Sequence, residues 1–272
     1  MLTFPPAKIN IGLRVVRRRA DGYHDLQTIF YPIPLTDALE IVPDREEMIW
    51  DDGGFDPEGS WQDNLVYKAY ELISREVRPL PPVEIILRKH IPTGAGLGGG
   101  SSDASAALNM LDRLYELGLS SDERRELARK LGADCPFFIT PEPSYAEGIG
   151  DILSPIGLDL TGLHLWLALP PIHVSTALAY GKVTPRVPEA DLCEAITLPL
   201  KEWNGTICND FEEGVFAEYP LLGQIKETFY DMGADFALMS GSGSTIFALA
   251  KGPFGGDLLS GMEQVKILDY TL

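Results

Sequence analysis

The chain of 272 residues lacks the features that define several large classes of protein. Its cysteines are Cys135, Cys193 and Cys208, an odd number at wide spacing that fits neither a disulfide framework nor a zinc motif. No apolar run approaches the ~18–20 residues of a membrane-spanning helix, and the first residues, MLTFPPAKIN, lack the basic and then apolar pattern of a secretory signal. We therefore expect reduced thiols, no membrane partner and a cytoplasmic location.

Positive charge is also scarce. The chain has 22 Lys and Arg against 40 Asp and Glu, which gives a formal net charge of −18. Such a surface repels nucleic acid, so we expect no nucleic-acid partner. A basic pocket for a small anion is still allowed, because salt confines the field of a surface charge to about 8–10 Å. The expected partner is a small molecule, and the sequence leaves the oligomeric state undefined.

Alternating and helical hydrophobic patterns predict interleaved strands and helices. In KINIGLRV (residues 8–15) aliphatic and polar residues alternate, which predicts a strand with Lys8 and Asn10 on one face. Further strands are expected at residues 83–89, from residue 164, and on both sides of SGSGS (240–244). Helices are expected at 63–76, from the glycine-rich stretch to 117, at 120–132 and at 219–233. The order does not alternate strictly, which favours an α+β fold over a parallel sheet.

Several residues mark the expected ends of these helices. Asp63 is the expected N-cap of the first helix. Ser120 and Glu123 have the spacing of a capping box. We expect Gly132 to end that helix and Pro136 to prevent its continuation.

The stretch PTGAGLGGGSSDASAAL, Pro92 to Leu108, lies between a predicted strand and a predicted helix. Glycines allow a tight backbone whose N–H groups point inward, and the first turn of a helix adds unpaired N–H groups and positive potential. Together they predict a cradle for an anion such as phosphate. Ser101 and Ser102 could cap the helix, contact phosphate or help to hold Mg²⁺, and their spacing leaves these roles open.

Other interpretations of this stretch fit less well. A Walker loop requires a lysine before the serine, and none is present. Gly94, Gly96 and Gly99 match a dinucleotide fingerprint, but the nearest acidic residue at suitable spacing, Asp112, lies within the predicted helix. A flexible loop without a ligand is disfavoured, because glycines would weaken the neighbouring strand and helix and no function would offset that cost.

The glycine stretch resembles the phosphate-binding motif of the GHMP kinases. PPAKINIGL near the N-terminus and MSGSGSTIFAL (239–249) resemble two further motifs of that family. The segments RADGYH, LGADCPFF, EGIGDILSPI, VSTALAY and NDFE narrow the resemblance to the branch that phosphorylates 4-diphosphocytidyl-2-C-methyl-D-erythritol. The resemblance extends from Pro5 to about Ala250, which is nearly the whole chain.

This resemblance implies a two-domain α+β GHMP kinase fold. A ribosomal-S5-like N-terminal domain would cover residues 1–158, and a ferredoxin-like C-terminal domain would cover residues 159–272. ATP would be the phosphoryl donor, with Mg²⁺ on its phosphates and undefined metal ligands in the protein. The acceptor would be the 2-hydroxyl of the cytidyl substrate, in the non-mevalonate pathway to isoprenoid precursors.

The resemblance also assigns site residues. The residues expected to bind ATP are Pro92, Gly94, Ala95, Gly96, Leu97, Gly98, Gly99, Gly100, Ser101, Ser102 and Asp103. A second glycine loop is expected at Ser240, Gly241, Ser242 and Gly243. Asn64 is either a purine contact or a helix cap, and the sequence leaves both open.

Lys8 and Asp134 match the catalytic residues of the family. Phosphoryl transfer needs positioning, charge neutralisation and a base that reaches the acceptor hydroxyl. A lysine near the aspartate would stabilise the ionised carboxylate and offset charge on the transferred group. Without the resemblance, a solvated lysine on a strand and an aspartate in a turn would be the simpler interpretations.

Five residues match the substrate site of the family. They are Asn10, Tyr23, His24, Phe30 and Tyr180. Aromatic rings can stack on a pyrimidine, and Asn10 could bind a substrate hydroxyl or orient Lys8. Taken singly, Phe30 would be assigned to the core, Tyr23 to a half-buried surface and Asn10 to a strand edge.

Three alternatives stay open at this stage. Arg17, Arg18 and Arg19 either attract a diphosphate or form a solvated basic turn. The chain could be another GHMP kinase, of the homoserine or mevalonate type, which needs no cytidine-stacking cluster. It could also be a non-catalytic nucleotide-binding relative, although Lys8 and Asp134 are both present.

Overall fold

The computed structural model describes residues 1–54, 60–188, 191–252 and 264–272. In these residues three four-stranded sheets combine with helices, so the predicted α+β class is confirmed. The chain forms two compact units that are not consecutive in sequence. The first unit comprises Met1–Ala7, Leu35–Thr93 and Gly98–Glu142, and the second comprises Lys8–Pro34, Gly94–Leu97 and Pro143–Leu272.

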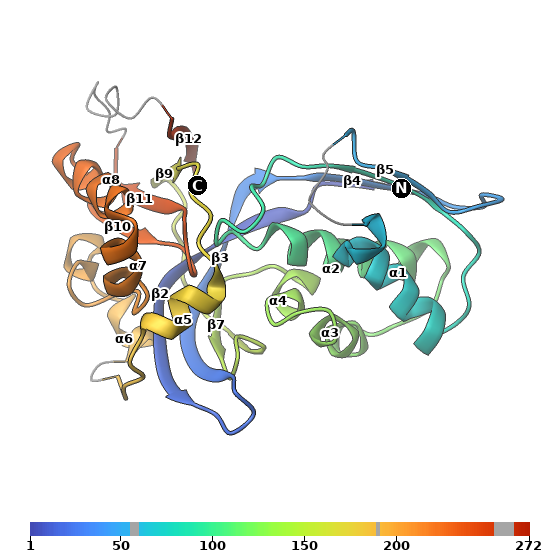
Figure 1. The fold of residues 1–272 in the computed structure, drawn as a ribbon, viewed down its shortest axis with the longest axis horizontal. Helices are drawn as coiled ribbons and strands as arrows, with labels where there is room; N and C mark the ends of the chain where they lie inside the picture. Colours follow the sequence, from blue (N-terminus) through green and yellow to red (C-terminus); the bar gives the residue numbers. More distant parts are fainter. Residues whose placement is uncertain (55–59, 189–190, 253–263) are drawn as a thin grey trace. The chain divides into compact units, whose positions relative to one another are not determined.

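The first unit is a sheet covered by helices on one face (Figure 1). Its strands have the order β1 (Leu2–Thr3), β4 (Ala38–Val42), β6 (Glu84–Arg88) and β5 (Ile49–Asp51). β1 and β6 pair antiparallel to β4, and β5 is parallel to β6. The helices of this unit are η1 (Trp61–Asp63), α1 (Leu65–Glu76), α2 (Gly99–Leu114), α3 (Ser121–Arg129) and α4 (Cys135–Ile139).

Buried aliphatic side chains from this sheet, α1 and α2 form one core. Leu39 and Ile85 of the sheet pack in it with Ala69 of α1 and Leu108 of α2. Cys135 is buried in the same core, and burial raises the pKa of its thiol to about 11. Such a thiol stays protonated at neutral pH and is unreactive, consistent with the expected reduced cysteines.

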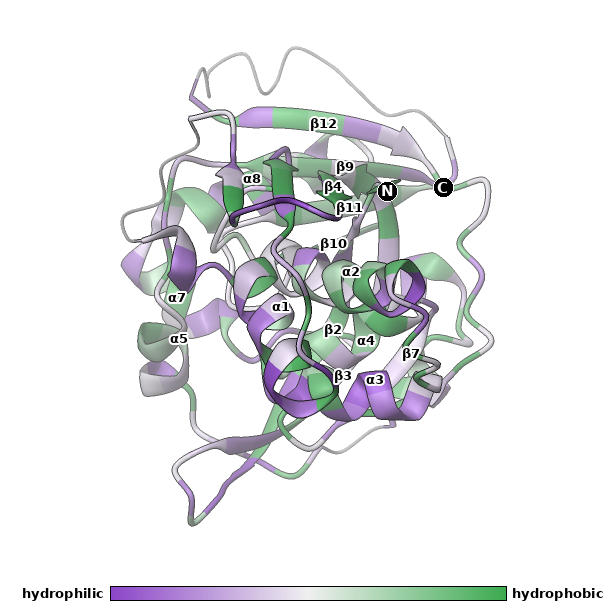
Figure 2. Cartoon of the chain, turned by 90° about the vertical axis from the view of Figure 1, so that its right-hand side faces the viewer, coloured by the Kyte–Doolittle hydropathy of each residue, from purple (hydrophilic) through white to green (hydrophobic). Residues whose placement is uncertain are grey.

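The helix ends agree with the sequence in part. The Ser120–Glu123 capping box of α3 is present, and α3 is largely hydrophilic (Figure 2). The expected cap at Asp63 is wrong, because Asp63 ends η1 and the N-cap of α1 is Asn64, whose side-chain Oδ1 accepts from the Val66 N–H at 2.9 Å. Pro136 does not prevent a helix at its own position. It lies in the first turn of α4, where a proline lacks only a hydrogen bond that the helix could not make.

The second unit contains two antiparallel sheets. One has the order β2 (Pro6–Arg18), β3 (His24–Thr36), β7 (Ser144–Glu147) and β8 (Ile152–Pro155). The other has the order β10 (Phe236–Met239), β11 (Ile246–Ala250), β9 (His164–Leu169) and β12 (Lys266–Thr271). The helices are α5 (Thr176–Lys182), α6 (Leu192–Ala195), η2 (Leu200–Trp203), α7 (Glu212–Glu218) and α8 (Pro220–Asp231).

The strands predicted in this unit are found, and the one expected from residue 164 is β9. The strand expected at 8–15 is the longer β2, and the two strands around SGSGS are β10 and β11. Helix α8 packs on β10 and β11, and its buried residues Leu222, Ile225 and Phe229 fill the core beneath. β9 and β11 are the central strands of their sheet, as in the expected ferredoxin-like arrangement.

The compact units divide the chain differently from the predicted domains. Residue 158 falls inside the second unit, because β7 and β8 complete the sheet that β2 and β3 begin. The units group residues by contact, so the division into 1–158 and 159–272 stays a prediction about homologous domains. Among the described residues, none of the helices has the length and apolar character needed to cross a membrane.

Candidate active site

Lys8 and Asn10 lie side by side on β2, as the alternation predicted, but both are buried. Their exposed fractions are 3% and 2%, so the interpretation of Lys8 as a solvated lysine is wrong. The Lys8 Nζ donates to Asn10 Oδ1 and to the carbonyl oxygen of Gly96 at 3.2 Å. It also lies 5.0 Å above the ring centre of Phe30, which is 2% exposed. A buried ammonium with these partners is held in one position.

The first half of the glycine stretch, Gly94–Leu97, belongs to the second unit and packs against the second glycine loop. The Gly96 carbonyl accepts from the Ser240 hydroxyl at 2.8 Å, and the Ala95 carbonyl accepts from the Thr245 N–H at 3.2 Å. Gly96 has φ +78°, and a Cβ there would lie 2.0 Å from the Ser240 carbonyl oxygen. The sequence predicted both loops but not their contact.

A further residue supports the second loop and was missed by sequence reasoning. Asn209 is 3% exposed, and its Nδ2 donates to the carbonyls of Met239 at 2.8 Å and Gly241 at 2.7 Å. Its Oδ1 accepts from the Phe211 N–H at 3.0 Å. The only sequence signal was its place in NDFE, a segment that resembles the family motif without an obvious chemical role.

The second half of the glycine stretch, from Gly98, begins α2 in the first unit. The N-cap is Gly98, with φ 71°, and a glycine has no side chain to satisfy the first-turn N–H groups. These groups and the helix dipole can therefore receive an anion, as predicted.

Of the roles left open for Ser101 and Ser102, capping of this helix is excluded. Both lie inside α2, because the helix begins at Gly99. Ser102 is 1% exposed, and its hydroxyl donates to the Pro6 carbonyl at 2.7 Å. This hydroxyl therefore anchors the helix to the N-terminal segment.

Asp103 lies in a buried charged cluster that the sequence did not reveal. The Lys89 Nζ pairs with Asp37 and, at 2.6 Å, with Asp103 Oδ2. Asp37 is fully buried, and Asp103 Oδ1 has no hydrogen-bond partner among the described residues. Burial raises the pKa of Asp103 to about 7, and Lys89 opposes that rise. The predicted contact of Asp103 with ATP stays a prediction.

Asp134 is the N-cap residue of α4, and its side chain makes no capping hydrogen bond there. It is partly buried and follows α3, so a short ordered turn presents it. Asp134 belongs to the first unit and Lys8 to the second. The predicted pairing of the two residues therefore stays a prediction.

Two of the aromatic candidates meet in the second unit. The rings of His24 and Tyr180 stack with centroids 4.9 Å apart and an interplanar angle of 21°. The ring of Tyr180 also meets the ring of Phe211 edge-on, with the two ring centroids 4.8 Å apart. Tyr23, at the hairpin, is 61% exposed. Phe30 lies beneath Lys8, and at about 3.3 Å per residue along β3 it is roughly 20 Å from His24, so it does not join this cluster.

The positive charge of the basic turn at residues 17–19 is largely neutralised by two aspartates of the same hairpin. Arg17 pairs with Asp25, and Arg19 pairs with Asp21 at 2.8 Å and Asp25 at 3.2 Å. The Arg17 guanidinium lowers the pKa of the Asp25 carboxyl below its usual value. These exposed pairs favour a solvated turn over a diphosphate site.

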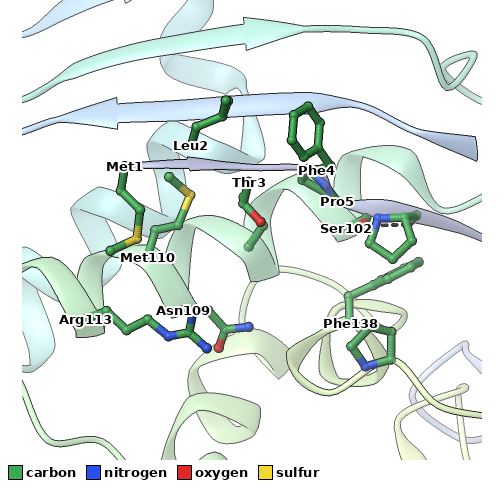
Figure 3. Close-up of a pocket in the computed structure, with 13 residues that line it drawn as sticks. Met1, Leu2, Thr3, Phe4, Pro5, Ser102, Asn109, Met110, Arg113 and Phe138 are labelled. Carbon is green, nitrogen blue, oxygen red and sulfur yellow. Dashed lines mark hydrogen bonds between the residues drawn. The ribbon is translucent and has the colours of Figure 1, made fainter.

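A cavity of about 340 Å³ lies in the first unit, between the N-terminal segment and α2 (Figure 3). Met1 to Pro6 form one wall, and Ser102, Asn109, Met110 and Arg113 of α2 form another. Neither Lys8 nor Asp134 lines it, so we do not assign the predicted reaction to it. In the described part of the chain, no group of three or more His, Cys, Asp or Glu could hold a metal ion.

Comparison with known proteins finds relatives over most of the chain. Residues 64–141 match the GHMP kinases N terminal domain, and residues 197–256 match the GHMP kinases C terminal domain. The chain is 48% identical over 252 residues to the 4-diphosphocytidyl-2-C-methyl-D-erythritol kinase of Bacteroides fragilis, with 92% of each protein covered. It is 46% identical over 258 residues to the same kinase of Porphyromonas gingivalis, again with 92% of each covered.

Solved structures show the same relationship. A crystal structure of 4-(cytidine 5'-diphospho)-2C-methyl-D-erythritol kinase matches with a TM-score of 0.80 and 34% identity, covering 99% of this chain and 98% of the other. The mevalonate kinase of Methanococcus jannaschii matches with a TM-score of 0.74 at 15% identity, covering 99% and 97%. The second likeness indicates a shared fold alone.

Proposed function

Because the chain belongs to the GHMP kinases, and within them to the 4-diphosphocytidyl-2-C-methyl-D-erythritol kinases, we propose that it phosphorylates the 2-hydroxyl of that cytidyl substrate with ATP. This reaction belongs to the non-mevalonate pathway to isoprenoid precursors. The observation that carries the proposal in the structure is the buried Lys8 ammonium, which contacts the Gly96 carbonyl of the first glycine loop. A charge held at that loop can act on a phosphoryl group bound there.

The phosphates of ATP would bind at the glycine stretch. The uncapped first turn of α2 offers N–H donors, and the helix dipole favours negative charge. Mg²⁺ fits such a site through the phosphate oxygens and water, because it needs few protein ligands there. When bound, the ion neutralises phosphate charge.

Lys8 and Asp134 would divide the chemistry between them. The Lys8 ammonium would stabilise negative charge that develops on the transferred group. Asp134, presented at the start of α4, would accept the proton of the 2-hydroxyl. Asn10 would hold Lys8 in place, since its Oδ1 accepts from the Lys8 Nζ.

The cytosine base would stack on the aromatic cluster. His24 and Tyr180 are already in contact, and the exposed ring of Tyr23 precedes His24 in the hairpin. Kinases for homoserine or mevalonate have no base to stack, so this cluster favours the cytidyl substrate over those alternatives. Phe30 would act through Lys8, whose ammonium lies above its ring.

ADP release is the test of this proposal. We expect turnover with ATP and 4-diphosphocytidyl-2-C-methyl-D-erythritol, and none with homoserine or mevalonate. Lys8→Ala and Asp134→Asn should lower kcat by roughly 10²–10⁴-fold, and the exposed Lys201→Ala should not. Tyr180→Leu should raise the KM of the cytidyl substrate roughly 5–150-fold, because one stacking contact is lost, while the KM of ATP stays unchanged.

Several outcomes would count against the proposal. Turnover on mevalonate or homoserine alone would assign the chain to a different kinase activity. Bound ATP without ADP release on any acceptor would support a non-catalytic relative. Near-normal turnover of Asp134→Asn would remove the general base from the mechanism.

A further inference from the structure

Three buried side chains of the second unit form a hydrogen-bonded chain that ends at Lys8. The Thr28 hydroxyl on β3 donates to the Gly12 carbonyl at 2.5 Å. The Asn10 Nδ2 donates to Thr28 Oγ1 at 2.9 Å, and Asn10 Oδ1 accepts from the Lys8 Nζ. Thr28 is fully buried, and Asn10 and Lys8 are almost so. Water therefore does not compete for these contacts.

The Thr28 hydroxyl determines which group donates and which accepts in each of these hydrogen bonds. A backbone carbonyl only accepts hydrogen bonds, so the single proton of the Thr28 hydroxyl is used on Gly12. The Thr28 oxygen can then only accept, and the Asn10 group that faces it must be the NH₂. The Asn10 carbonyl is consequently the group that faces the Lys8 ammonium.

The reversed amide would make two repulsive contacts. It would place the Asn10 carbonyl against an oxygen without a free proton, and the NH₂ against an ammonium that has only donors. Both contacts would be buried, where unsatisfied polar groups are most costly. The Thr28 hydroxyl and the Lys8 ammonium therefore favour the same orientation of Asn10.

The Gly12 carbonyl, which accepts the hydrogen bond of Thr28, has a well-defined direction. Gly12 has φ +76° within β2, a conformation that glycine adopts readily. A Cβ at this position would lie 2.7 Å from Leu192 Cδ1. The direction of the Gly12 carbonyl thus depends on a glycine at this position.

We propose that Thr28 is a positioning residue for phosphoryl transfer. Oriented by Gly12, it sets the amide of Asn10 so that an acceptor holds the Lys8 ammonium at the Gly96 carbonyl. The inference rests on the proposed function, in which Lys8 acts on the transferred group. Among the described residues, Thr28 hydrogen-bonds to Gly12 and Asn10 and to none of the predicted ATP-binding residues, so it should affect kcat and leave the KM of ATP unchanged.

The test compares three variants of the full-length chain. Thr28→Val keeps the shape but removes the hydroxyl, and should lower kcat about 10–100-fold with the KM of ATP within about twofold. Thr28→Ser keeps the hydroxyl and should recover most of the turnover. Ser74→Ala removes a buried hydroxyl that has no hydrogen-bond partner among the described residues, and serves as the control for folding effects.

A double-variant cycle tests whether Thr28 acts through Asn10. In an Asn10→Ala background no amide is left to orient, so Thr28→Val should lower kcat by less than about twofold. The side-chain amide protons of Asn10, followed by NMR, should exchange with solvent faster in Thr28→Val than in the wild type. This readout does not depend on activity.

Two results would overturn the inference. One is unchanged kcat in Thr28→Val with unchanged Asn10 exchange, and the other is a full additional loss of kcat in the double variant. A wild-type chain that does not turn over the cytidyl substrate would instead contradict the proposed function. The Asn10 exchange measurement would still test the positioning role in that case.

Discussion

Gly96 is a residue at which a single methyl group should disrupt the site. Its φ of +78° disfavours any L side chain, and a Cβ would lie 2.0 Å from the Ser240 carbonyl oxygen. That oxygen belongs to backbone and has little freedom to move. The close approach of the two glycine loops therefore depends on the absence of a side chain here.

We predict that Gly96→Ala lowers the free energy of unfolding by more than about 2 kcal/mol and abolishes turnover. Gly100→Ala is the matched control for stability, because Gly100 lies in α2 and a Cβ there has its nearest contact at 3.8 Å. Alanine should stabilise the helix at Gly100 by about 0.5–1 kcal/mol. Thermal unfolding measures both effects, and equal melting temperatures for the two variants would contradict the prediction.

At the scale of elements, the end of β6 is joined to α2 by the cluster of Asp37, Lys89 and Asp103. Asp37 Oδ1 accepts from the backbone N–H groups of His90 at 2.5 Å and Ile91 at 2.9 Å, while Lys89 reaches Asp103 in α2. Two carboxylates share one ammonium, and burial raises the pKa of Asp103 to about 7. Relative to the unfolded chain, the folded state therefore favours the protonated form of Asp103.

This raised pKa predicts a pH dependence of stability. The ordinary pKa of an aspartate is about 3.9, so between about pH 4 and 7 the folded state holds a proton that the unfolded state has released. The contribution of Asp103 is fully present below about pH 4 and is lost as the pH rises to about 7. Its full size is roughly 4 kcal/mol for about three pKa units.

Asp103→Asn should remove this dependence. Relative to the wild type, the variant should become more stable as the pH rises from 5 to 8, because no buried carboxylate has to ionise. Denaturant unfolding at the two pH values measures this, with the exposed Asp269→Asn as control. Parallel stability curves for Asp103→Asn and the wild type would show that Asp103 does not titrate in this range.

At the scale of the whole molecule, the units cannot be separated by one cut in the chain. The sheet of β9 to β12 lies wholly after residue 158, but its core cluster also contains Leu13 and Val15 of β2. Leu13 forms a bridge with Asn209, the residue that supports the second glycine loop. Residues from the start of the chain thus complete a core built by its end.

A fragment of residues 159–272 should therefore fold poorly alone. It would lack Leu13 and Val15, whose burial contributes about 1.5–3 kcal/mol each. We expect a broader urea transition for the fragment than for the intact chain, measured by circular dichroism. A sharp transition at the same midpoint would indicate that the predicted domain boundary at residue 158 also separates independent folding units.

Local patterns predicted much of the fold and the positions of several candidate site residues within it. The alternation in residues 8–15 predicted β2 and the shared face of Lys8 and Asn10, and the Ser120–Glu123 spacing predicted the cap of α3. These features depend on neighbours a few residues away. Helix starts were less predictable, because glycine at 98 caps α2 without the side-chain signal that pointed to Ser101 and Ser102.

The sequence by itself determined the family, the α+β class, the two glycine loops and the residues expected to carry the chemistry. Each of these can be predicted from residues that lie close together in the sequence. Only the tertiary structure decided that Lys8 is buried, that Gly96 meets Ser240, and that Thr28 directs Asn10. Gly96 and Ser240 are 144 positions apart. Contacts over such separations depend on packing across sheets and loops, which no local pattern of residues encodes.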